Sequence, residues 1–147
     1  MKKPELSVKY FMESATCAQS IMAVYGPEVG LNIEQSLQIG SSLGGGIGYQ
    51  QHICGAINAG AIIIGLKHGN SVHGDMEKKK RAIKLAGDYV LECQQILGNT
   101  QCSELIKIDL NNEEQKEKAN TDGLFDRVCN NAVQKCAEIL EKYLNEK

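Results

Sequence analysis

The uncharged stretch from Gly44 to Leu66 constrains the fold of this chain more than any other feature. From Ile53 to Leu66 nearly every residue is apolar or small, and a helix that is apolar on all sides is a buried helix. Three glycines lie inside this run, among them Gly55 and Gly60, and each costs roughly 0.5–1 kcal/mol relative to alanine. That cost predicts a close approach of another helix or a bound group. We therefore expect the Ile53–Leu66 helix at the centre of the fold.

Composition favours one helical domain over residues 1–147. The hydrophobic content of 42% and the charged content of 23% are ordinary for a globular protein. Prolines occur only at Pro4 and Pro27, few runs favour strands, and no alternating pattern is sustained. These features predict an all-α bundle around the glycine-rich central helix. With a net charge of −2 and no tryptophan, the chain has no sign of a nucleic-acid-binding surface.

Apolar periodicity and capping residues predict further helices on both sides of the central one. Thr16 and Gln19 have the spacing of a capping box, which predicts a break in the first helix before Cys17. Thr100 is the expected cap of the short helix that contains Cys102. The expected helices are Leu6–Tyr25 with that break, Ile33–Leu43, Asp75–Leu97, one starting near Thr100, a solvated one within Asp109–Asp122, and Leu124–Leu144.

Six cysteines suggest thiol chemistry. The basic start of the chain has no apolar segment behind it, and the run Ile53–Leu66 is too short to cross a bilayer. We therefore expect a cytoplasmic protein without a membrane partner, and in that compartment thiols stay reduced. The cysteines are then better interpreted as metal ligands, catalytic thiols or buried residues than as structural disulfides. None of them forms a Cys-x-x-Cys pair, so the zinc-ribbon and thioredoxin patterns have no support.

Cys54-Gly55-Ala56, followed by Gly60, resembles the signature of a known family. This is the family of "putative redox-active proteins" (C_GCAxxG_C_C), with a Cys-Gly-Ala-x-x-Gly motif and four characteristic cysteines along about 140 residues. The last glycine of the motif falls on Ala59, one place before Gly60. The resemblance covers nearly the whole chain, and its four cysteines correspond to Cys17, Cys54, Cys102 and Cys129.

The resemblance implies a redox protein in which these four thiols act together. If they converge, they can hold an iron–sulfur cluster or a zinc ion, and we expect such a centre to serve electron transfer. A second possibility is a metal-free protein in which two thiols cycle between dithiol and disulfide. A third is a helical interaction module with structural thiols. The resemblance supplies no substrate, so no enzyme class is assigned.

The surroundings of the thiols refine these expectations. Cys17 and Cys102 each fall in the first turn of an expected helix, where free backbone N–H groups favour a thiolate. No lysine or arginine lies within six residues of Cys54, so backbone dipoles must compensate charge there. His52 and the backbone of Gly55 are candidates for support of the thiols from a second shell.

Cys93 and Cys136 match no cysteine of the family. Both lie on apolar helix stripes, and we interpret them as buried thiols outside the site. The central helix and several apolar stripes exceed what a minimal bundle needs, which predicts a homodimer. A redox protein is a further possible partner.

Overall fold

Helices form all the regular secondary structure of residues 1–146, which the computed structural model describes, and the expected all-α fold is confirmed. Ile53 and Gln101 form an isolated antiparallel β-bridge, which is not part of a sheet. The helices in chain order are α1 (Lys3–Met12), α2 (Cys17–Tyr25), the short 3-10 helix η1 (Pro27–Val29), α3 (Ile33–Ser41), α4 (Gly55–His68), α5 (Met76–Leu97), α6 (Cys102–Ile106), α7 (Glu113–Asp122) and α8 (Leu124–Leu144).

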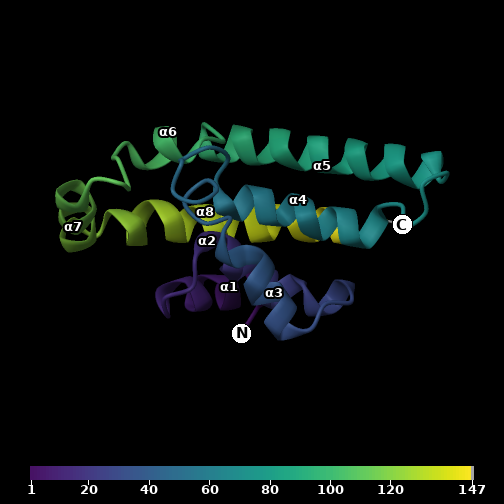
Figure 1. The fold of residues 1–147 in the computed structure, drawn as a ribbon, viewed down its shortest axis with the longest axis horizontal. Helices are drawn as coiled ribbons and strands as arrows, with labels where there is room; N and C mark the ends of the chain where they lie inside the picture. The colour runs from purple at the N-terminus through teal and green to yellow at the C-terminus, as the bar shows by residue number, and fades with distance from the viewer. Residues whose placement is uncertain (147) are drawn as a thin grey trace.

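Helix α4 is the central element. It packs against α2, α5 and α8, and Figure 1 shows it between the long α5 and the layer formed by α1, α2 and α3. Ile57, Ile63 and Ile64 are fully buried. Two details differ from the expectation of a helix over Ile53–Leu66 that is buried on all sides. The helix begins two residues later because Ile53 pairs with another segment. Leu66 is 44% exposed, whereas His68 in the same turn is buried and hydrogen-bonded to the carbonyl of Tyr143, so the last turn is buried on one side only.

The predicted helix break before Cys17 is confirmed, since α1 ends at Met12 and α2 begins at Cys17. The side chain of Thr16 accepts the N–H of Gln19, and the Gln19 side chain accepts the N–H of Thr16, both at 3.0 Å. Gly40 lets α3 approach this turn, because a Cβ there would lie 2.7 Å from the backbone nitrogen of Gln19. The Thr16 hydroxyl also donates to the carbonyl of Gly40 at 3.2 Å. The start of α2 is thereby fixed from two sides.

The apolar interior consists of two clusters. The larger one fills the space around α4 with residues of α2, α5 and α8. The smaller one is built on Cys102, Ile106 and Leu110, with Phe125 packed against it. Helix α6 starts after Gln101 rather than after the expected cap Thr100, because the Thr100 carbonyl accepts the N–H of Cys54 instead.

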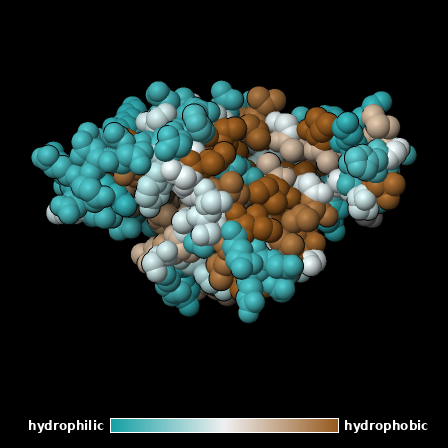
Figure 2. Space-filling view, viewed as in Figure 1, coloured by the Kyte–Doolittle hydropathy of each residue, from teal (hydrophilic) through white to brown (hydrophobic). Residues whose placement is uncertain are grey.

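The surface is unevenly apolar. Figure 2 shows hydrophilic residues over the end of the molecule where α7 lies and hydrophobic ones over α4 and its neighbourhood. Within residues 1–146, no helix is both long and apolar enough to cross a membrane.

Candidate functional site

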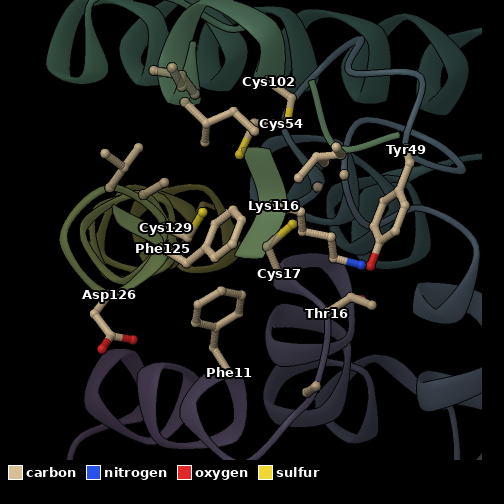
Figure 3. A pocket seen from close by; sticks show the side chains of 18 of the residues that line it. Phe11, Thr16, Cys17, Tyr49, Cys54, Cys102, Lys116, Phe125, Asp126 and Cys129 are labelled. Carbon is tan, nitrogen blue, oxygen red and sulfur yellow. The ribbon is translucent and has the colours of Figure 1, made fainter. Parts of the chain in front are cut away.

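The four cysteines that the resemblance groups together, Cys17, Cys54, Cys102 and Cys129, line one cavity of about 400 Å³. The cavity lies where the larger and the smaller apolar clusters meet, with Cys17 and Cys54 on the side of the larger cluster and Cys102 and Cys129 on the other. Figure 3 shows the four side chains around this common space. Cys17 and Cys129 are partly exposed, whereas Cys54 and Cys102 are buried.

Each of the four thiols comes from a different helix. Cys17 is the first residue of α2, as expected, and Cys102, expected in a first helical turn, is the first residue of α6. Cys129 lies in the N-terminal part of α8. Cys54 is not inside the central helix, as the apolar run suggested, but is its N-cap residue. Its side chain therefore lies beside the free N–H groups of the first turn of α4.

Backbone pairing holds Cys54 and Cys102 next to each other. The N–H of Cys54 donates to the carbonyl of Thr100 at 2.8 Å, and the N–H of Cys102 donates to the carbonyl of His52 at 2.7 Å. His52 thus supports the site through its backbone. Its side chain is exposed and does not line the cavity, so the expected support from the imidazole is not seen.

Cys17 and Cys54 form a hydrogen-bonded pair of thiols. Cys54 donates to the sulfur of Cys17, which lowers the pKa of Cys17 to about 6 against the opposing effect of burial. The backbone N–H groups of Gly45, Ala18 and Gly55 also donate to this sulfur. Cys17 is therefore a thiolate at neutral pH, and its charge is stabilised by hydrogen bonds and helix N-termini rather than by a lysine or arginine.

Cys54 holds the proton of the pair. Its role as donor to Cys17 raises its pKa well above the usual range, and burial and the Cys17 charge add to this effect. The N–H groups of Ala56 and Ile57 act in the opposite direction. The close approach depends on Gly55, because a Cβ at that position would overlap the sulfur of Cys17. Gly55 therefore contributes to this close approach both through its N–H and through its lack of a side chain.

Cys102 and Cys129 are protonated thiols. Burial, followed by the charge of Cys17, raises the pKa of Cys102 to about 11. The same two causes, with smaller contributions from Cys102 and Asp126, raise the pKa of Cys129 to about 12. A first-turn position thus does not make Cys102 a thiolate, because burial outweighs it.

Sulfur donors of this kind would suit zinc or an iron–sulfur cluster. Within residues 1–146, however, no three side chains of the types His, Cys, Asp or Glu lie close enough together to hold one metal ion. The four thiols share a cavity, but only Cys17 and Cys54 contact each other, while Cys102 and Cys129 stand apart. As they stand they do not fit a metal site.

A tightly wound loop between α3 and α4 brings the N–H of Gly45 to Cys17. Ile47, Tyr49 and Gln51 all have positive φ, between 61° and 68°, a conformation that is costly for a β-branched residue such as Ile47. The Gln51 side chain holds the loop in place, because it donates to the carbonyl of Ile108 at 2.6 Å and accepts the N–H of Leu110 at 3.0 Å. This strained loop had no sequence signal beyond its glycines.

The remainder of the cavity wall is largely apolar. Figure 3 shows the rings of Phe11 and Phe125 near the thiols. Lys116 brings a positive charge to the wall, and its Nζ lies 4.8 Å from the centre of the Tyr49 ring. Sequence analysis did not single out these four residues, since they come from segments whose relative position only the tertiary fold sets.

Cys93 and Cys136 do not line the cavity. Both are completely buried in the larger apolar cluster, as their positions on apolar stripes predicted. The two side chains are hydrogen-bonded to each other, which the sequence did not indicate.

The model of one protein family, described as "Putative redox-active protein (C_GCAxxG_C_C)", matches residues 15–143. The family description gives the motif in the order Gly-Cys-Ala-x-x-Gly, so the expected family order Cys-Gly-Ala-x-x-Gly was wrong. This chain has Cys54-Gly55-Ala56 instead. No curated protein and no solved structure matches the chain.

Proposed function

Because the chain belongs to this family of putative redox-active proteins, we propose that it is a thiol–disulfide redox protein in which Cys17 is the nucleophile and Cys54 the resolving thiol. One observation carries the proposal: the Cys17 thiolate accepts a hydrogen bond from the thiol of Cys54 at the wall of a cavity. A stabilised thiolate next to a second thiol is the arrangement that disulfide exchange requires.

The substrate we propose is a small disulfide. Cys54 is 7% exposed, and the surrounding wall is largely apolar, so a compact and uncharged molecule reaches the pair more easily than a folded protein does. For the second half-reaction we propose a protein partner whose dithiol attacks Cys17, the more exposed sulfur of the pair, and returns the pair to its reduced form. The proposed compartment is the reducing cytoplasm.

The reaction begins with attack by the Cys17 thiolate on one sulfur of the substrate. A bond forms between this sulfur and Cys17, the substrate disulfide breaks, and the thiolate that leaves takes the proton of Cys54. Cys54 then attacks the sulfur of Cys17, which forms the protein disulfide and releases the second substrate thiolate, protonated by water. The substrate gains two electrons and two protons, and the dithiol is oxidised.

Two sets of backbone N–H groups assist these steps in turn. While Cys17 carries the charge, the N–H groups of Gly45, Ala18 and Gly55 stabilise it. Once Cys17 is bonded to the substrate, its charge is gone and no longer opposes ionisation of Cys54. The N–H groups of Ala56 and Ile57 are then in position to stabilise the Cys54 thiolate.

Peptide mapping of the oxidised protein tests the proposal. The reduced protein is treated with a neutral small disulfide such as hydroxyethyl disulfide, alkylated, and digested without reduction. We expect a Cys17–Cys54 link in the wild type and also in the variants Cys102→Ser and Cys129→Ser. Cys17 and Cys54 that both remain open to alkylation would overturn the proposal.

A metal centre is the second candidate function. It is favoured by the fact that all four family cysteines line the same cavity. Binding would require Cys102 and Cys129 to move toward the Cys17–Cys54 pair, since the described side chains do not form a metal site as they stand. Anaerobic purification with iron, sulfide and zinc analysis tests it. A protein that holds no metal and forms no disulfide would instead be a structural helical module.

A further inference from the structure

Cys93 and Cys136 bring two more thiols together, away from the cavity. Cys93 comes from α5 and Cys136 from α8, which pack against each other along the molecule (Figure 1). Neither side chain has any exposed surface, and the two are hydrogen-bonded. A pair of contacting thiols differs from the usual small core residue because its two sulfurs can be joined without rearranging the chain over a long distance.

Polar groups accompany this pair in an otherwise apolar core. Tyr89, one turn before Cys93, donates its hydroxyl proton to the carbonyl of Ala56 at 3.1 Å, and the same hydroxyl oxygen lies beside the Cys93 sulfur. Gly60 makes room for the hydroxyl, because a Cβ there would overlap it. The ring of Tyr89 packs edge-on against Tyr143 with 6.1 Å between centroids, which fixes the hydroxyl beside the pair. The hydrogen bond from Cys136 lowers the pKa of Cys93, against the opposing effect of burial.

We propose that Cys93 and Cys136 form a second dithiol–disulfide couple, which small uncharged hydroperoxides oxidise inside the core and which links α5 to α8. The inference is independent of the proposed function of Cys17 and Cys54. Complete burial restricts the oxidant to a molecule close to the size of water, since neither a protein nor a charged disulfide reaches these sulfurs without unfolding. Hydrogen peroxide has the required size and neutrality.

The chemistry balances with hydrogen peroxide as the oxidant. The sulfur of Cys93 attacks one oxygen, the O–O bond breaks, and the hydroxide that leaves takes the proton of the Cys93 thiol to become water. Cys93 is now a sulfenic acid, and the sulfur of Cys136 displaces its hydroxyl group, which leaves as a second water. The two thiols lose two electrons and two protons in total, and the peroxide is reduced to two molecules of water.

The link would restrain one side of the cavity. It would close the segment 94–135 into a loop, and this segment contains α6 and α7 together with Cys102 and Cys129. Joining the ends of such a segment reduces the freedom of the unfolded chain. The oxidised core pair is therefore expected to make unfolding of this part harder, while leaving the Cys17–Cys54 pair free to react.

The test uses the full-length protein. The reduced wild type is treated with hydrogen peroxide, denatured, alkylated and digested without reduction. We expect a Cys93–Cys136 linked peptide and a melting temperature higher by roughly 5–10 °C, a rise that dithiothreitol reverses. Cys136→Ala should abolish the rise and leave Cys93 to proceed beyond sulfenic acid, whereas Cys129→Ala, on the same helix, should retain the link.

The wild-type peptide map shows whether Cys93 and Cys136 form a disulfide even if Cys136→Ala fails to fold. Cys93 and Cys136 that stay fully open to alkylation after denaturation would overturn the inference, as would a link from either to a cavity cysteine. The same map shows whether Cys17 and Cys54 are linked, so failure of the core pair is distinguishable from failure of the proposed function.

Discussion

At the scale of single residues, the pKa of Cys17 determines how the site reacts. Because the folded protein lowers this pKa to about 6, the thiolate is present above pH 6 and is lost below it. We predict that the alkylation rate of Cys17 rises through a midpoint near pH 6. In Cys54→Ala, which lacks the main hydrogen-bond donor, the midpoint should move up toward the unperturbed value of about 8.5. Brief alkylation followed by peptide mapping measures both, and equal midpoints in the two proteins would contradict the role of Cys54.

Sequence analysis could predict part of this environment. The first-turn positions of Cys17 and Cys102 followed from local capping patterns, because capping is set by residues three apart. The different ionisation of the two thiols could not be predicted in this way. It depends on the donors Cys54 and Gly45, which belong to distant segments, and on the burial of Cys102 in the smaller cluster.

At the scale of helices, the glycines of α4 separate into two kinds. Gly55 is needed for the approach of Cys17, whereas Gly65 is exposed and a Cβ there would meet no atom within 4 Å. We predict that Gly55→Ala lowers the free energy of unfolding by about 1–3 kcal/mol through overpacking. Gly65→Ala, in the same helix, should raise it by about 0.5–1 kcal/mol. Denaturant unfolding measures both, and two effects of the same sign would count against the close approach at Gly55.

The cap of α2 permits a second matched comparison. Thr16 caps the helix that carries Cys17, and Asn32 caps α3 with the same pair of hydrogen bonds. Replacing either by alanine should cost about 1 kcal/mol of stability. Only Thr16→Ala should also raise the pH midpoint of Cys17 alkylation, because only that cap fixes the N–H of Ala18 at the sulfur. A shift of similar size in Asn32→Ala would mean that the midpoint reports general loosening instead.

Helix positions were largely predictable, since capping boxes and apolar periodicity are local signals. The start of α4 was not, because Ile53 continues the apolar run but its backbone pairs with Gln101. The cap at Gln101 rather than Thr100 has the same cause. Pairing between segments some fifty residues apart leaves no periodic trace in either of them.

At the scale of the whole molecule, the exposed apolar surface bears on assembly. Leu91 and Ile96 of α5 are 58% and 57% exposed, and Figure 2 shows further hydrophobic surface over α4. We predict a homodimer in solution. Light scattering at micromolar concentration measures its mass, and Leu91→Lys should favour the monomer if this face is the interface. A wild type that is monomeric under these conditions would refute the prediction.

The meeting of four thiols in one cavity is a property of the whole fold. No periodicity relates Cys17, Cys54, Cys102 and Cys129, and only their resemblance to one family grouped them before the structure did. The same limit applies to Cys93 and Cys136. The apolar stripes of their helices predicted that both residues are buried. Contact between them depends on how the two helices pack against each other, and a stripe does not indicate this.

Trapping of the reaction intermediate tests the central claim most directly. In Cys54→Ser the hydroxyl can still donate to Cys17, but it cannot resolve a mixed disulfide. Treatment with hydroxyethyl disulfide should therefore leave Cys17 of this variant bonded to one half of the reagent, as shown by the mass of its peptide. The wild type should contain the Cys17–Cys54 link instead. If Cys54→Ser carries the reagent on another cysteine while Cys17 remains free, Cys17 is not the nucleophile and the account is contradicted.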